Sequence, residues 1–219
     1  RFSADMALAM KADITLYEGT YCKYRNANDN AGKAADNARA EKYLRECVSA
    51  CETLMGKGYS LNPSYQGNYN SISLSSNPEM IFYKPYSQNT FMHSTIDYTI
   101  NTSGTSGMTK NAFDSYLFLD GKPKATTTMD TNDAAVKDAV LAVRDKRLAI
   151  TLDPVLCFKG SAYSRAGVAA FTSTTGYGIA KYDNTAELSV SDRNSIGKQY
   201  TDCPLFWLSV VYLNFAEAK

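Results

Sequence analysis

Side chains suited to a binding surface are concentrated in three segments of this sequence, residues 65–70, 83–98 and 163–171. The candidate ligand-binding residues are Tyr83, Tyr86, Asn89, Phe91, His93, Tyr98 and Tyr163, and the first segment adds Tyr65, Gln66, Asn68, Tyr69 and Asn70. A tyrosine ring combines an apolar face with a polar tip, and small-ligand sites pair apolar walls with a few hydrogen-bonding groups. These residues therefore predict non-covalent capture of a small polar ligand. The alternative is that they anchor their own loops to the scaffold.

The sequence lacks the patterns typical of enzymes and metal sites. Its single histidine, His93, has no neighbouring Ser/Asp signature, and there is no G-x-S-x-G, P-loop or dinucleotide-binding glycine motif. Five cysteines include no C-x-x-C pair; Cys47 and Cys51, four residues apart, are predicted to share a buried helix face. A glycosidase needs two carboxylates at a defined separation, which spacing in the sequence cannot establish. We expect no catalytic residues, no metal and no cofactor.

Composition predicts a globular protein without a nucleic-acid partner. Of the 219 residues, 44% are hydrophobic, and 23 basic residues against 22 acidic ones leave a net charge of +1. With so balanced a charge, the sequence has no excess of basic residues that would attract nucleic acid or an anionic membrane surface. The most apolar stretch, 205–215, is shorter than the roughly 20 residues that span a bilayer. We therefore expect membrane contact only through an anchor outside this chain.

Hydrophobic periodicity predicts helices at both ends and irregular chain between them. Apolar residues three and four apart indicate helices over 1–24 and 36–56, which form an antiparallel pair as region 1–58. Region 59–203 is predicted as an irregular ligand-bearing lobe, with a helix near 132–145 and short strands at 80–83 and 148–152. Region 204–219 is predicted as the start of the next scaffold helix, beginning at Pro204. We expect one mainly α structural unit.

Seven segments resemble, in order, motifs of the SusD/RagB family of outer-membrane nutrient-binding lipoproteins. The matching letters are RFSADMALAMKADITLYEG (1–19), MGKGYSL (55–61), NPEMIF (77–82), FDSYLFLDGK (113–122), RDKRL (144–148), TGY (175–177) and PLFWLSVVYLNFAEA (204–218). Trp207 and Val210 replace the Arg and Glu usual in the last motif, and Lys146 replaces the Pro of the fifth. The resemblance covers nearly the whole chain, and its departures concern local packing.

The resemblance implies a tetratricopeptide-like scaffold of helical pairs that carries a large irregular lobe. It also implies capture of oligosaccharides, or sometimes peptides, on the surface of Bacteroidetes-type bacteria. Family members are lipid-anchored at the outer membrane and form a lid over a TonB-dependent transporter of the SusC type. No family motif fixes the ligand residues. The alternative function is a helical-repeat protein-interaction module without a small-molecule site, and the long Tyr/Asn/Ser-rich loops favour ligand capture.

The chain begins and ends within helical patterns, so we expect an internal fragment of a longer protein. The apolar faces of helices 1–24 and 204–219 are then expected to be exposed. They would pack against another part of the protein or against a second copy.

Overall fold

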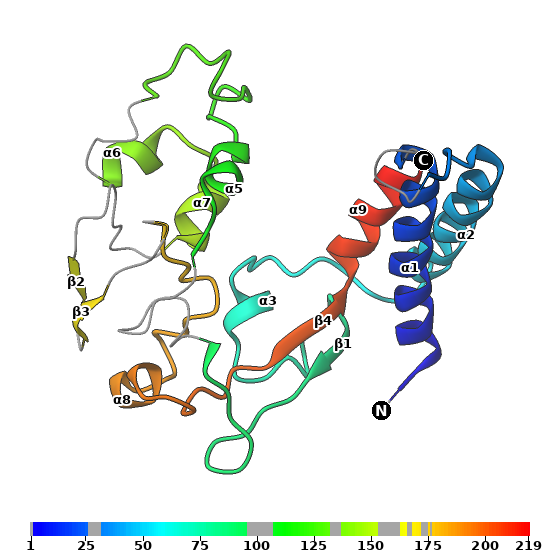
Figure 1. Cartoon of the computed structure of the whole chain (residues 1–219). Coiled ribbons are helices and arrows are strands. Elements are labelled where there is room, and N and C mark those ends of the chain that lie inside the picture. Colours follow the sequence, from blue (N-terminus) through cyan, green and yellow to red (C-terminus); the bar gives the residue numbers. More distant parts are fainter. Residues whose placement is uncertain are drawn as a thin grey trace. The chain divides into compact units, whose positions relative to one another are not determined.

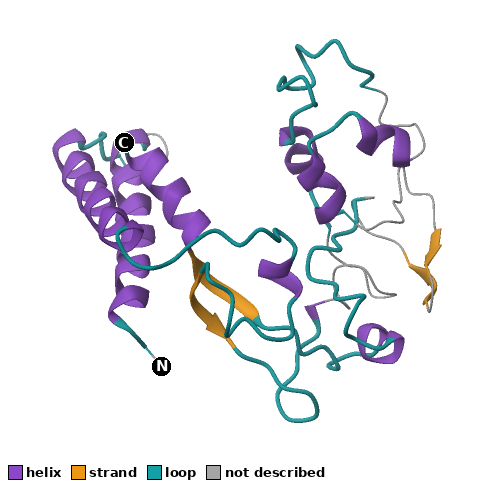
Figure 2. Ribbon diagram, turned by 180° about the vertical axis from the view of Figure 1, so that it is seen from behind, coloured by secondary structure: helices purple, strands orange, loops and turns teal. Residues whose placement is uncertain are grey.

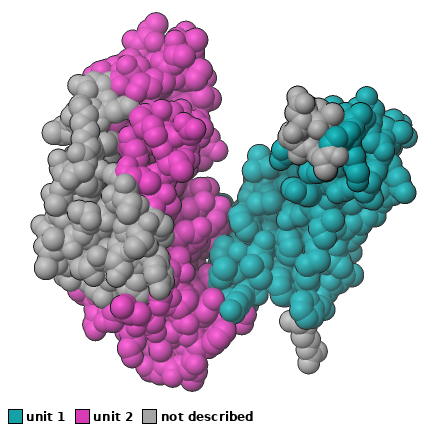
Figure 3. Space-filling view, in the orientation of Figure 1, with its two compact units in different colours: residues 1–64, 74–84, 203–219 teal, residues 65–73, 85–202 magenta. Residues whose placement is uncertain are grey.

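The computed structural model describes residues 2–25, 32–95, 107–131, 137–152, 163–165, 168–171, 175 and 177–219. The chain forms two compact units, which Figure 3 shows in different colours. Unit 1 comprises residues 1–64, 74–84 and 203–219, and unit 2 comprises residues 65–73 and 85–202. Helices are the main regular elements, joined by long irregular segments (Figures 1 and 2). The predicted fold class, mainly α with a loop-rich lobe and a few short strands, is confirmed.

Unit 1 is built on the predicted antiparallel helix pair, α1 (Ala4–Tyr24) and α2 (Asn37–Met55). Each helix begins at a side-chain cap: Ser3 accepts a hydrogen bond from the Met6 N–H, and Asp36 accepts one from the Arg39 N–H. Such caps satisfy backbone donors that have no partner within the helix. Both predicted helices are thus confirmed to within a few residues.

Small residues determine which face of α1 is buried. Ala9, Ala12 and Leu16 of α1 pack against a buried stripe of α2, which consists of Cys47, Ala50, Cys51 and Leu54. The two cysteines are fully buried with Sγ atoms 4.0 Å apart, which confirms their predicted shared face. Met10, Ile14 and Tyr17 lie on another face of α1 and are 41%, 60% and 66% exposed.

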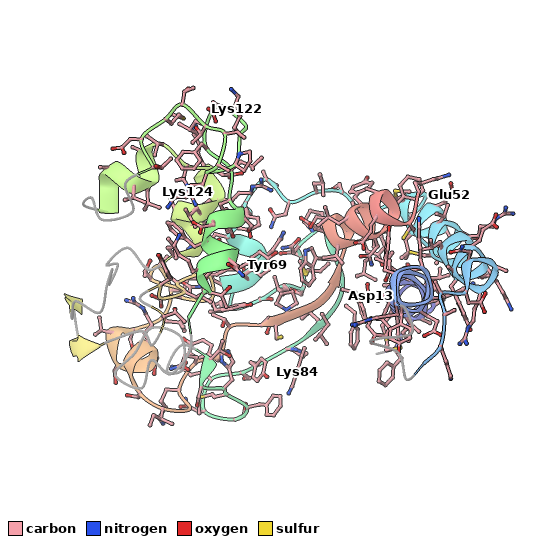
Figure 4. The ribbon with its side chains drawn as sticks, turned by 45° about the horizontal axis from the view of Figure 1, so that its top comes forward. Asp13, Glu52, Tyr69, Lys84, Lys122 and Lys124 are labelled. Atoms are coloured by element: carbon pink, nitrogen blue, oxygen red, sulfur yellow. The ribbon has the colours of Figure 1, made fainter. Side chains whose placement is uncertain are left out.

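A two-stranded antiparallel sheet and a third helix complete unit 1. Strand β1 (Met80–Lys84) confirms the strand predicted at 80–83, and it pairs with β4 (Cys203–Trp207). The helix predicted from Pro204 is therefore wrong at its start, because α9 begins only at Leu208 and ends at Ala218. Pro204 fits β4 because a strand of a two-stranded sheet has an open edge that needs no N–H donor. Helix α9 packs on α2 and α1, and Asn214 donates a hydrogen bond to Asp13, labelled in Figure 4.

Unit 2 has short elements connected by irregular chain. They are α3 (Gly67–Asn70), α5 (Lys110–Ser115), α6 (Lys137–Ala142), α7 (Lys146–Thr151), β2 (Tyr163–Arg165), β3 (Val168–Phe171) and α8 (Val190–Asn194). A second core joins Phe113 of α5, Val140 of α6 and Leu148 of α7 with Leu152 and Tyr177. Within the described residues, no helix of either unit is long and apolar enough to cross a membrane.

One prediction for unit 2 is confirmed in part and one is wrong. The helix predicted near 132–145 is present as α6 but ends before Arg144, and its residues 132–136 lie outside the described residues. The Arg144 guanidinium lies over the rings of Phe113 and Phe118, 4.6 and 4.4 Å from their centroids. The strand predicted at 148–152 is the helix α7, which the Asp145 carboxylate caps by accepting from the Arg147 N–H. This local cap outweighs the β propensity of a short apolar run.

Candidate functional site

The structure brings three of the predicted site residues together in the loop that follows β1. Tyr86 stacks on Phe91 with ring centroids 5.0 Å apart and an interplanar angle of 11°. The His93 ring meets Tyr86 edge-on at 4.6 Å. Phe91 remains 50% exposed, so part of this surface faces solvent. We call Tyr86, Phe91 and His93 the aromatic patch.

A tight turn makes this stacking possible. The Ser87 N–H donates to the Phe91 carbonyl at 2.8 Å, and the Phe91 N–H donates back to the Ser87 carbonyl at 3.0 Å. Asn89 lies at the tip with φ of 65°, a left-handed conformation that asparagine tolerates better than most residues. Asn89, a predicted ligand residue, thus has a local role in folding the loop back.

Buried polar residues from the segment before β4 hold the patch in place. The carboxylate of Asp202, 4% exposed, accepts the Tyr86 N–H at 2.8 Å. His93 and Gln199 exchange two backbone hydrogen bonds of 2.8 and 3.2 Å. The Gln199 side chain is fully buried and donates to the carbonyls of Asp192 and Ser195 at 3.0 Å. The patch is therefore pre-organised, which lowers the entropy lost when a ligand binds.

His93 is fixed by hydrogen bonds that suit a structural role. Its Nδ1 accepts the Thr95 N–H at 3.2 Å, so Nδ1 carries no proton. Nε2 then carries the proton and donates to the Thr201 carbonyl at 3.0 Å. Both ring nitrogens are occupied, and the ring contributes its face and edge rather than a proton.

Three other predicted ligand residues lie either in unit 1 or outside the described side chains. Tyr83 lies on β1 in unit 1, where it pairs with Pro204. Tyr98 lies outside the described residues, and only the backbone of Tyr163, in β2, is described. Among the described side chains, no group of three His, Cys, Asp or Glu residues is arranged to hold a metal ion.

Comparison with solved structures finds a similar fold in SusD superfamily proteins. A crystal structure of a SusD superfamily protein from Parabacteroides distasonis ATCC 8503 aligns with 100% of this chain, at a TM-score of 0.50 and 14% identity. A SusD superfamily protein from Bacteroides fragilis NCTC 9343 aligns with 99% of the chain at the same TM-score and identity. The chain has the SusD-type fold. It spans 40% of the length of each of these solved structures.

The SusD-type fold confirms, at the level of architecture, the resemblance inferred from the motifs. A scan against protein-family models and a search of curated proteins found no match. The shared feature is therefore the fold, and the ligand chemistry has to be argued from the side chains of this chain.

Proposed function

We propose that this protein captures oligosaccharides at the cell surface and delivers them to a TonB-dependent outer-membrane transporter of the SusC type. The SusD-type fold supports this role. The observation that carries the proposal is the aromatic patch, a stacked and partly exposed ring pair supported by buried hydrogen bonds. In this proposal the protein is a binding protein and not an enzyme, and a lipid anchor outside this chain attaches it to the outer membrane.

The chemistry of the patch suits a sugar. The C–H face of a pyranose ring can stack on the exposed part of Phe91, while its hydroxyls bond to polar groups nearby. The loop around the turn supplies such groups through the exposed side chains of Gln88, Asn89 and Thr90. Because the frame beneath is already formed, little rearrangement is needed on binding.

The test is calorimetric titration with neutral hexasaccharides of glucose, mannose and xylose. Phe91→Ala is expected to weaken binding about tenfold, or about 1.4 kcal/mol, because it removes the exposed stacking surface. The matched control is Phe2→Ala, since Phe2 is also exposed and also stacks on another ring, Phe82, at 5.9 Å. Phe2 belongs to unit 1, and its loss should leave binding unchanged.

Two other results would change the proposal. Binding of peptides instead of sugars, with co-purification of an outer-membrane transporter, would keep the capture role and replace the ligand. Absence of any ligand and of any transporter would overturn the proposal and favour the helical-repeat interaction module. The exposed face of α1 is the observation that supports this second candidate.

A further inference from the structure

A cleft lies within unit 2, separate in sequence from the aromatic patch. It is a cleft of about 530 Å³, lined by Tyr65 before α3, by Ser115, Tyr116 and Leu117 at the end of α5, and by Asp145 and Arg147 at the start of α7. This volume falls in the range of small-molecule sites, about 300–1,000 Å³. Of these residues, the sequence indicated only Tyr65 as a binding candidate.

One wall of the cleft is the Tyr65 ring, whose position is fixed by its neighbours. The Tyr65 ring meets Tyr69 edge-on at 5.2 Å, and the Lys181 ammonium lies 3.6 Å over the Tyr69 ring and 5.2 Å over the Tyr65 ring. Tyr69 is labelled on α3 in Figure 4. Contacts of a cation with an aromatic face are attractive and hold the rings in place.

The Tyr116 hydroxyl can accept a hydrogen bond from a ligand. The Thr151 hydroxyl donates its proton to the Arg147 carbonyl at 2.8 Å. The Tyr116 hydroxyl, 3.3 Å from the Thr151 oxygen, must therefore act as the donor in that contact. Its oxygen keeps its lone pairs for another donor.

An ion pair supplies the charged groups of the cleft. The Arg147 Nε lies 3.0 and 3.2 Å from the two carboxylate oxygens of Asp145, and Nη2 lies 2.5 Å from Oδ2. The side-chain bonds from Arg147 and its backbone N–H hold the pKa of Asp145 below the ordinary 3.8. Asp145 is thus ionised at neutral pH and acts only as an acceptor. Arg147 Nη1 makes no hydrogen bond to any described residue, so it can donate to a ligand.

This donor and acceptor set selects one ligand class. A pair of adjacent sugar hydroxyls can donate to Asp145 and Tyr116 and accept from Arg147, while the tyrosine rings face the sugar's C–H groups. A ligand carboxylate would meet the ionised Asp145, whose charge already neutralises Arg147. We propose that this cleft is a subsite for a neutral saccharide unit, a proposal that rests on the proposed function and assigns it a second contact point.

The test compares variants of the cleft with the same neutral hexasaccharides and with hexagalacturonate as the acidic probe. Arg147→Gln retains the backbone N–H that caps α7 but replaces the guanidinium with a shorter, neutral amide and so removes the Nη1 donor, and we expect about tenfold or greater weakening of neutral-sugar binding. Tyr116→Phe keeps the ring and removes the acceptor, with an expected loss of about threefold to tenfold. Arg45→Gln is the control, because Arg45 forms an exposed ion pair with Glu41 on α2 in unit 1. Thermal melting of each variant confirms folding.

The outcomes separate this subsite from the proposed function. Weakening by both cleft variants, with Arg45→Gln unchanged, supports the subsite. Binding that depends on Phe91 but not on Arg147 or Tyr116 leaves the proposed function in place and overturns the subsite. Tighter binding of hexagalacturonate than of the neutral sugars overturns the assigned ligand class, and no binding of any sugar overturns both proposals.

Discussion

At the scale of single residues, Glu79 has the clearest structural role in unit 1. It is 2% exposed, and its two carboxylate oxygens accept the N–H groups of Asn62 and Ser209 at 2.9 and 3.1 Å. Ser209 lies in the first turn of α9, whose preceding residue Trp207 makes no side-chain cap. Glu79, the residue before β1, therefore supplies the cap that α9 lacks, and a negative charge is favourable at a helix N-terminus. The N-P-E segment thus lies directly before β1 and also fixes the start of α9.

Glu79→Gln tests this capping role. The substitution keeps the shape but places an amide NH₂ against one of the two N–H donors, which leaves a buried donor without an acceptor. We expect a loss of about 1.5–3 kcal/mol in the free energy of unfolding, measured by urea denaturation. Glu41→Gln is the control, since Glu41 is exposed and paired with Arg45 on the same helix, and it should change stability by less than about 0.5 kcal/mol. Equal stability of the two variants would contradict the cap.

The residue scale also shows which part of the site could be predicted from sequence. Tyr86, Phe91 and His93 are close in the chain, so their residue types and spacing indicated the aromatic patch. Asp202 and Tyr86 are 116 positions apart in the sequence, so no local sequence pattern predicts their contact. Tyr116, Asp145 and Arg147 were also missed as a group, because their motifs have an ordinary structural interpretation as loop and ion-pair residues. Only the three-dimensional arrangement shows that residues of α5 and α7 line the same cleft.

At the scale of elements, the α1–α2 contact depends on close approach of the two backbones. A Cβ atom placed on Gly19 would lie 2.8 Å from Cγ and Cδ2 of Leu44 and 3.2 Å from its backbone nitrogen. The leucine side chain can rotate away, but the backbone nitrogen moves only with α2. Glycine at this position is thus required by packing, although it is a poor helix former.

Gly19→Ala is expected to destabilise unit 1 by about 1 kcal/mol. Alanine improves helix propensity by about 0.5–1 kcal/mol, whereas overpacking costs about 1–3 kcal/mol. The control Gly58→Ala adds the same methyl group after α2, where nothing lies within 4 Å, and should be neutral or slightly stabilising. Thermal melting of both variants measures the difference. A Gly19→Ala protein as stable as the control would show that α2 shifts freely.

The long helices of the chain could be predicted from the sequence, whereas the type of its short apolar runs could not. Helices α1 and α2 are long and periodic, and their caps and apolar residues agree. The runs at 148–152 and 204–207 are too short for periodicity to distinguish helix from strand. A partner distant in sequence decided one run and a local cap decided the other. The antiparallel partner β1 makes 203–207 a strand, and the Asp145 cap makes 146–151 a helix.

At the scale of the whole molecule, unit 1 has an apolar surface that its own core does not use. The exposed side chains Met10, Ile14 and Tyr17 are three or four residues apart and Tyr24 follows Tyr17 after two helical turns, so the four form one stripe along α1. Contiguous exposed apolar surface is uncommon on monomers and marks interaction sites. The net charge of +1 provides little repulsion between copies. The sequence predicted this exposure from the helical pattern, and what covers the stripe remains a prediction.

We expect the isolated chain to self-associate through this stripe. Ile14 is 60% exposed at its centre, so Ile14→Glu introduces a charge that would be desolvated in any contact between copies. Sedimentation velocity over a concentration series should show a reversible dimer or larger species for the original chain and a larger monomer fraction for the variant. Ile196→Glu is the matched control, because Ile196 is 75% exposed but belongs to unit 2 and not to the stripe. A monomer at all concentrations would contradict self-association. If both substitutions raised the monomer fraction equally, the effect would come from added charge in general and not from the α1 stripe.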